Sequence, residues 1–270
     1  MSEVAESART SAPVHGPRWS ARAVDWAELT APISAPAWED VAEATGIAKR
    51  TRILDVACGS GEFCRLAAVR GALVSGIDAA ERMIEIARRL VPGADLRVGA
   101  MESLPWDDHS FDVVTAFNAF QFATDMLTAL AEAKRVARPG GQVAICNWAR
   151  PETSGLIAVM GALRGLQPPP PPGARQPDPP AIGEPGVLEA LALEAGLEPA
   201  RASEVDVPFE APDEETLLRA LLAPGGASLA IEHSGEQAVR KAIGDASAPF
   251  RRLDGSYRIE NRFRYLIARA

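Results

Sequence analysis

Short apolar runs alternate with longer segments of helical periodicity over the first 150 residues. The apolar runs predict five strands, at residues 52–57, 73–78, 96–100, 111–117 and 141–148. Between them the apolar residues recur every three or four positions, as Met83, Ile84, Ala87 and Leu90 do, which predicts helices. Because strands that alternate with helices form a parallel sheet covered on both faces, we expect a doubly wound α/β core over residues 40–150.

The pattern changes after residue 150. Residues 165–186, "GLQPPPPPGARQPDPPAIGEPG", hold nine prolines, which excludes a continuous helix or a central strand. This composition indicates a stiff loop in the polyproline conformation, or a ligand for a proline-binding domain. Beyond it we expect a helix at 187–197, a strand at 202–210, helices at 215–223 and 235–246, and a last strand from residue 257, antiparallel at or near the sheet edge.

These elements predict one architecture for the chain. We expect an α/β fold with a Rossmann-like, doubly wound sheet of about seven strands, mostly parallel with an antiparallel last strand. Residues 1–18 are polar and are expected to form a disordered lead. Residues 19–270 are then a single domain, in which residues 151–186 form a proline-rich connection or lid element.

Composition and charge limit the classes of molecule that the protein is expected to bind. The formal net charge is −8, which disfavours nucleic acid and anionic membranes as partners and favours a small molecule. The three cysteines, Cys58, Cys64 and Cys146, show neither disulfide nor zinc spacing, so we expect a reduced, cytoplasmic protein without a metal. No apolar run reaches the ~20 residues of a membrane span, and the first residues lack the pattern of a signal peptide.

The stretch "RILDVACGSGEF", residues 52–63, has the glycine-rich turn of a nucleotide site but an unusual acid. A dinucleotide site has a third glycine where this chain has Cys64. Asp55 would repel a pyrophosphate at this turn, whereas it would attract an ammonium group. Asp78 ends the second strand, where an acid accepts hydrogen bonds from ribose hydroxyls. The pattern therefore indicates a nucleoside with a cationic, amino-acid-like tail, such as S-adenosylmethionine.

From about residue 21 to residue 270 the chain resembles the class I S-adenosylmethionine-dependent methyltransferases of small molecules. The resemblance lies in "ILDVACGSG", "GIDAAERM", "VGAMESLPW", "FDVVTAFNAFQF" and "RVARPGG", in this order and at family-like spacing. It implies S-adenosylmethionine as cofactor, S-adenosylhomocysteine as product and a small-molecule acceptor. Neither the oligomeric state nor the acceptor atom (oxygen, nitrogen or carbon) follows from it.

The resemblance also implies cofactor contacts at twelve positions that follow the first four strands. They surround the methionine portion, the ribose, the adenine and the methyl-donor end in turn: Asp55, Ala57, Cys58 and Gly59; Asp78; Ala79, Met83, Ala100, Met101 and Glu102; Phe117 and Asn118.

Two of these positions depart from the family pattern. Ala57 replaces the first glycine of the turn, which is tolerable at a negative φ angle. Ala100 replaces the usual acid after the third strand, and Glu102 either substitutes for that acid or caps the next turn. We expect cofactor binding to survive both changes.

The sequence offers fewer candidate residues for binding the acceptor than for binding the cofactor. Gln121 and Phe122 follow the fourth strand, in the crevice where open α/β sheets bind ligands, whereas Phe120 fits the core. Trp19 and Trp26 would share one face of an N-terminal helix, as a lid or as core packing. His233 is the candidate base, or else a solvated residue at a helix end; His15 falls in the expected lead and His109 in a loop.

These features predict methyl transfer to a small, largely apolar metabolite. The alternative is a protein of the same fold that transfers no methyl group, such as a pericyclase, another cyclase or a cofactor-binding scaffold.

Overall fold

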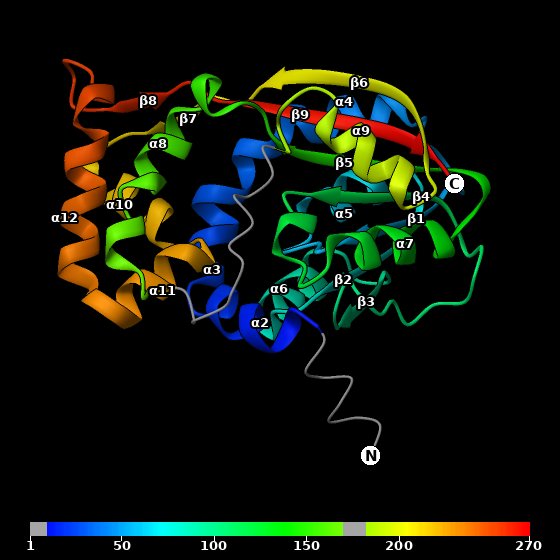
Figure 1. Cartoon of the computed structure of the whole chain (residues 1–270). Helices are drawn as coiled ribbons and strands as arrows, with labels where there is room; N and C mark the ends of the chain where they lie inside the picture. Colours follow the sequence, from blue (N-terminus) through cyan, green and yellow to red (C-terminus); the bar gives the residue numbers. More distant parts are fainter. Residues whose placement is uncertain (1–9, 170–181) are drawn as a thin grey trace.

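A seven-stranded mixed sheet forms the centre of the computed structural model, which describes residues 10–169 and 182–270 (Figure 1). The strand order is β3-β2-β1-β4-β5-β9-β6. The strands are β1 (Arg52–Val56), β2 (Leu73–Asp78), β3 (Asp95–Val98), β4 (Phe111–Phe117), β5 (Ala137–Trp148), β6 (Glu198–Asp206) and β9 (Arg262–Arg269). The first five are parallel, and β9 is antiparallel to both β5 and β6. The predicted fold class is confirmed, with the last strand one place in from the sheet edge.

Helices cover both faces of the sheet. Alternate residues of the central strands point to opposite faces, so Ile53 packs toward α5 (Glu62–Val69) and α6 (Glu81–Leu90), and Leu54 packs toward α7 (Met126–Val136) and α9 (Val187–Glu194). The helix α4 (Ala35–Ala44) completes the first of these faces. Burial on both faces explains why the strands are continuous apolar runs.

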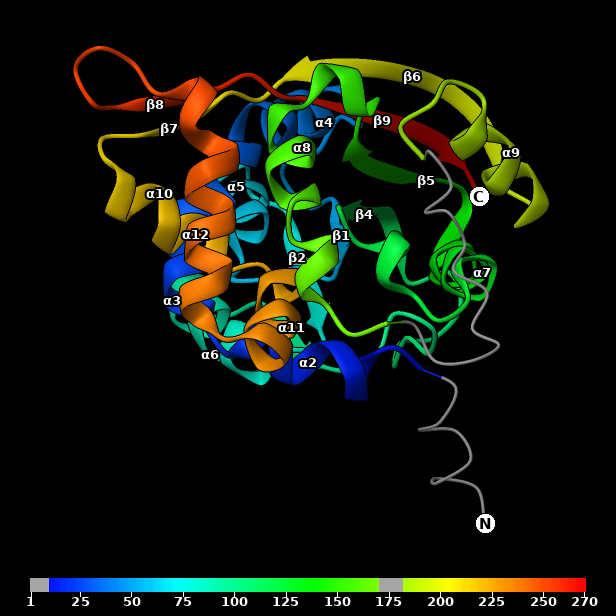
Figure 2. The ribbon, with the colours of Figure 1, turned by 60° about the vertical axis from the view of Figure 1, so that its left-hand side comes forward.

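A second group of helices stands beside the carboxyl ends of the strands (Figure 2). It consists of α8 (Gly155–Gly161), α10 (Glu214–Leu222), α11 (Gly225–Ser234) and α12 (Glu236–Ser247), which share an apolar core around Leu163, Leu217 and Ile243. We call this group the cap. Neither α8 nor α11 was predicted. The first lies in the expected proline-rich connection of residues 151–186, and the second begins with two glycines, which disfavour a helix.

The predicted last strand is divided in two. The short strand β8 (Tyr257–Ile259) pairs with β7 (Phe209–Ala211) in a separate two-stranded sheet at the cap, and β9 then enters the main sheet. The buried side chain of Asn261 lies at the break, where it donates to the Ile259 carbonyl and accepts from the Leu156 amide. A side chain that bonds to nearby backbone in this way competes with the strand ladder.

The N-terminal segment corrects a prediction. The expectation of a disordered lead through residue 18 is wrong from Ala12 onward, because α2 (Ala12–Ser20) is a helix, followed by α3 (Ala23–Asp25), the π-helical η1 (Trp26–Thr30) and the short η2 (Ala31–Ser34). Gly16 explains the error. Its Cα lies so close to the chain after β2 that a Cβ there would be 2.5 Å from the Ala79 carbonyl oxygen. Tertiary packing therefore stabilises a helix that its own residues, with Pro17 inside it, do not favour.

Two predictions fall wholly or partly on residues outside this description. They are the first nine residues of the expected lead and residues 170–181 of the proline-rich stretch. Among the described helices, none is long and apolar enough to cross a membrane.

Candidate active site

A cavity of about 490 Å³ opens at the carboxyl ends of β1, β2 and β4, beneath the N-terminal segment and the cap. Its volume is typical of small-molecule sites, and ligands bind in this region of open α/β sheets. Most of the predicted site residues line it: Trp19, Trp26, Asp55, Ala57, Cys58, Gly59, Asp78, Ala79, Met83, Met101, Phe117, Asn118, Gln121 and Phe122. Ala100, Glu102 and His233 are not among its lining residues.

The turn after β1 is left-handed at three positions. The φ angles are 56° at Ala57, 53° at Gly59 and 90° at Gly61. Only glycine adopts this conformation without cost. At Gly61 there is also no room for a side chain, because a Cβ there would lie 2.8 Å from the Cβ of Ala87. The negative φ angle at which alanine would be tolerable is therefore not present at Ala57, and this alanine holds a strained conformation in the wall of the cavity.

Three carboxylates converge on the same end of the cavity. Burial raises the pKa of Asp55 to about 7, with the neighbouring Asp78 charge raising it further and a hydrogen bond from Thr115 opposing the shift. Burial also raises the pKa of Asp78 and that of Glu62, which sequence reasoning missed although it begins α5 directly after the turn. Within residues 10–169 and 182–270, none of the three is in an ion pair. The Arg65 charge partly opposes the effect of burial on the pKa of Glu62, but no ion pair within the described residues neutralises the three carboxylates, which favours a positively charged ligand.

Hydrogen bonds fix two of these carboxylates. Asp55 accepts from the Thr115 hydroxyl at 2.7 Å. The two oxygens of Asp78 accept from the backbone amides of Gly59 at 2.9 Å and Ala80 at 2.8 Å. Each Asp78 oxygen keeps a second lone pair, so the carboxylate can still accept from a hydroxyl of the ligand.

Glu102 holds the N-terminal segment rather than lining the cavity. Its buried carboxylate accepts from the Ser11 amide at 3.0 Å, the Ser11 hydroxyl at 3.1 Å and the Thr124 amide at 2.8 Å. The expected contact between Glu102 and the adenine is thus not supported, because this carboxylate already connects α2 to the loop after η3 (Phe120–Phe122). Ala100 is likewise outside the lining.

The histidine expected in the site is also a different one. His233 is exposed in the last turn of α11 and does not line the cavity, so it is not a candidate base. His15 does line it, and packs edge-on against Phe122 with ring centroids 5.4 Å apart. Burial lowers the pKa of His15, assisted by the Arg18 charge, which keeps its ring neutral near pH 7. The sequence held no signal for His15, because its segment was expected to be disordered.

The two predicted tryptophans meet over the glycine turn. Trp19 and Trp26 pack edge-on with ring centroids 4.8 Å apart, although the helix between them is broken. Trp19 also packs on Phe122 at 5.6 Å, and the indole nitrogen of Trp26 lies 3.6 Å from where a Cβ of Gly59 would be. The N-terminal segment therefore covers the part of the cavity that the carboxylates line.

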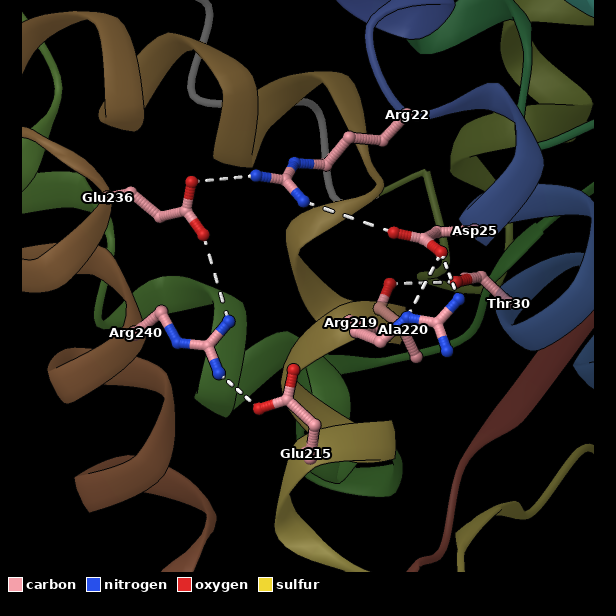
Figure 3. Close-up of polar contacts among 8 residues, drawn as sticks. All are labelled: Arg22, Asp25, Thr30, Glu215, Arg219, Ala220, Glu236 and Arg240. Carbon is pink, nitrogen blue, oxygen red and sulfur yellow. Dashed lines mark hydrogen bonds and ion pairs between the residues drawn. The ribbon is translucent and has the colours of Figure 1, made fainter.

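Ion pairs attach this segment to the cap (Figure 3). Asp25 pairs with Arg219 of α10 at 2.5 Å, and Arg22 pairs with Glu236 of α12 at 2.8 Å. The Thr30 hydroxyl donates to the Ala220 carbonyl at 2.7 Å. Contacts from both α10 and α12 thus hold the N-terminal segment across the cavity.

Comparison with known proteins gives consistent matches. Residues 54–145 match the model of a family described as "Methyltransferase domain". The chain is 35% identical over 167 residues to the ubiquinone biosynthesis O-methyltransferase of Bordetella bronchiseptica, a match that covers 59% of this chain and 67% of that protein. It is 37% identical over 94 residues to the demethylmenaquinone methyltransferase of Chlorobaculum tepidum, over 34% of this chain and 39% of that one.

A protein named for a different activity has a solved structure with the same fold. The structure of the 4+2 cyclase SpnF superimposes with a TM-score of 0.56 at 22% identity, over 86% of this chain and 79% of the cyclase. At this level of identity the similarity concerns the fold alone.

Proposed function

The chain belongs to the class I S-adenosylmethionine-dependent methyltransferases, and we propose that it methylates a small, largely apolar acceptor. The observation that carries the proposal is the group of three carboxylates, Asp55, Glu62 and Asp78, at one end of a cavity whose other walls are largely apolar. These residues fit a ligand that carries both an ammonium and a sulfonium charge.

In this proposal the three carboxylates bind two different parts of the cofactor. Asp55 and Glu62 would hold the ammonium group of S-adenosylmethionine, since they flank the turn that follows β1. Asp78 would accept from the ribose hydroxyls at the end of β2. Ala79, Met83 and Met101 would line the adenine site, which the N-terminal segment covers.

When bound, S-adenosylmethionine would supply an electrophilic methyl group on a sulfonium, with a neutral thioether as the leaving group. The protein contributes position and exclusion of water, because in-line displacement depends on alignment. Phe117 ends β4 and Asn118 follows it, both beside the cavity, and the cap and the N-terminal segment cover part of the cavity and limit the access of water. We assign no general base to the reaction.

The lining beyond the carboxylates supports an apolar acceptor. It includes Trp38, Trp148, Leu156, Ile157, Met160, Leu221 and Phe263. Two relatives named for ubiquinone and menaquinone chemistry agree with this preference for aromatic, apolar molecules. Burial of such a molecule stabilises the complex by about 25 cal/mol for each Å² of apolar surface removed from water.

Transfer of a labelled methyl group tests the proposal. The protein is incubated with methyl-labelled S-adenosylmethionine and a panel of hydroxylated aromatic compounds, and binding of the unlabelled cofactor is measured by calorimetry. We expect cofactor binding and label in at least one product. Cofactor binding without transfer to any compound of the panel would favour the cyclase or scaffold alternative, and absence of cofactor binding would contradict both.

A further inference from the structure

We propose that Asn118 selects the acceptor, by donating hydrogen bonds from its side-chain amide to an oxygen atom on a flat, conjugated ring. The acceptor class is then a hydroxylated aromatic or enol whose ring carries a carbonyl or hydroxyl oxygen, and amines are disfavoured. This inference rests on the proposed function and names the substrate class of the same cavity.

The orientation of the Asn118 side chain is fixed by the backbone. Its Oδ1 accepts from the amide of Trp148 on β5 at 3.1 Å, and its own backbone amide donates to the Cys146 carbonyl at 2.7 Å. Because a backbone N–H can only donate, the atom facing Trp148 must be the oxygen. The φ angle of 51° suits asparagine, which tolerates the left-handed region better than most residues do.

The nitrogen of the same side chain is left for a ligand. Asn118 Nδ2 has no hydrogen-bond partner within the described residues, and it is not among the buried polar atoms that lack one. The atom therefore keeps accessible surface, and the residue lines the cavity. Asn118 thus offers two N–H donors that no described residue uses, on a side chain that lines the cavity.

Gln121 adds polarity of the same kind close by. It lines the cavity, and its side-chain amide pairs with that of Asn147, with 3.2 Å between Asn147 Nδ2 and Gln121 Oε1. In this arrangement the Gln121 nitrogen also has no partner in the described chain and is not among the buried atoms. Gln121 therefore adds a second polar group on the same side of the cavity.

The charges on this side of the cavity disfavour a cation. The carboxylates of the lining come from β1 (Asp55), the end of β2 (Asp78) and the start of α5 (Glu62), where they would serve the cofactor. Among the described lining residues that β4, β5 and the cap contribute, none is charged, and the one charged residue just after α8 is the cation Arg164, in the 3-10 helix η5 (Arg164–Leu166). An ammonium acceptor would find neither an anion nor a free carboxylate there, so its desolvation would go uncompensated.

The walls on this side are aromatic. Phe117 packs between Phe63, at a centroid distance of 4.7 Å, and Trp38, at 6.5 Å. Trp148 packs edge-on against Phe263 at 4.7 Å. Aromatic walls stabilise a flat ring through stacked or edge-on contacts.

Binding of two matched probes tests the inference without methyl transfer. The protein is loaded with S-adenosylhomocysteine and titrated with 1-tetralone, which carries only a carbonyl, and with 1-aminotetralin, which carries an ammonium group on the same ring system. We expect the ketone to bind at least tenfold more tightly. The variant Asn118→Asp keeps the oxygen that faces Trp148 but replaces the donors by a carboxylate oxygen, and it should shift the ratio at least tenfold toward the amine.

A second variant guards against misfolding. Asn118→Gly accepts the left-handed φ and removes the amide, so the preference for the ketone should fall toward equality. Equal binding of both probes to the parent, an unchanged ratio in Asn118→Asp, or no binding of the ketone would each overturn the inference. Failure to bind S-adenosylhomocysteine would instead contradict the proposed function.

Discussion

Ala57 is a residue of the site whose backbone conformation is strained. A left-handed conformation costs an L-residue about 1–2 kcal/mol relative to the ordinary regions, and the φ of Ala57 is 56°. The family pattern has glycine at this position. The chain therefore accepts strain in the wall of its own cavity, where strained backbone often occurs.

Ala57→Gly should raise the free energy of unfolding by about 1 kcal/mol, because the strain disappears while the larger entropy of the unfolded glycine offsets part of the gain. Chemical denaturation measures the change. Ala131→Gly is the matched control: Ala131 is exposed inside α7, and its substitution should lower the free energy of unfolding by about 1 kcal/mol. Destabilisation by both substitutions would contradict the strain at Ala57.

Asp55 makes the stability of the free protein depend on pH. Its pKa is about 7 in the folded protein and near 3.8 when it is not perturbed, so the folded state binds the proton more tightly. The stability from this group is full below pH 3.8 and is lost as the pH rises through 7.

Asp55→Asn removes this dependence, because an asparagine stays neutral and can still accept from the Thr115 hydroxyl. At pH 8 and without cofactor, the variant should be more stable than the parent by on the order of a few kcal/mol. Denaturation curves at pH 5 and pH 8 give the comparison. Equal loss of stability between these pH values in both proteins would show that Asp55 is not the group responsible.

At the scale of elements, Glu102 connects three segments. It receives the hydrogen bonds of Ser11 at the start of α2 and of Thr124 after η3. Removing it leaves two backbone amides without their charged acceptor. Each such bond contributes about 1.5–3 kcal/mol, so the start of α2 should detach before the rest of the fold.

Glu102→Ala should therefore weaken binding of S-adenosylmethionine about tenfold and increase hydrogen exchange in residues 11–20, while the main sheet stays protected. Glu102→Gln is the control, since its oxygen can serve both amides and its nitrogen can donate to the Ser11 hydroxyl. The control should bind the cofactor within threefold of the parent. Unchanged exchange in residues 11–20 of the alanine variant would rule out the anchoring role.

The strands were predictable from the sequence for a physical reason that does not apply to the N-terminal helix. β2 and β4 begin and end where the apolar runs do, because strands buried on both faces need apolar residues throughout. Gly16 and Pro17 disfavour a helix, and α2 depends on contacts with residues far along the chain, such as Ala79 and Glu102. Sequence patterns report local preference, so α2 and its His15 were missed.

The same reasoning explains why some site residues were placed correctly from the sequence and others were not. Asp55 and Asp78 end strands, and strand ends meet at a known edge of the sheet, so their convergence follows from the pattern. The place of His233 depends on how the cap packs, which no local pattern gives. The exposed end of α11 carries it away from the cavity.

At the scale of the whole molecule, the N-terminal segment joins the sheet to the cap. Arg22, Asp25, Glu215, Arg219, Glu236 and Arg240 form one connected group of charges along this boundary (Figure 3). Isolated surface ion pairs contribute little, whereas charges in a network, with Asp25 partly buried, contribute more.

A double-mutant cycle with Asp25→Ala and Arg219→Ala should give a coupling energy of about 0.5–1 kcal/mol, reduced by about half or more in 1 M salt because the charges are screened. Lys241 and Asp245 are an exposed pair within α12 and serve as the control, for which we expect about 0.3 kcal/mol. Coupling no larger than that of the control pair would mean that the network does not hold the segment.

The central claim is that the carboxylates after β1 and β2 bind the cationic end of S-adenosylmethionine. Calorimetric titration of the cofactor into the parent and into Asp55→Asn, at pH 6.0 and pH 7.5, tests it most directly. Because the pKa of Asp55 is about 7, the ionised fraction rises between these pH values, and affinity for the parent should increase five- to tenfold. The variant should bind at least tenfold more weakly than the parent at pH 7.5, with little change between the two pH values. Binding of equal strength by parent and variant at pH 7.5, or no binding by the parent, would contradict the account.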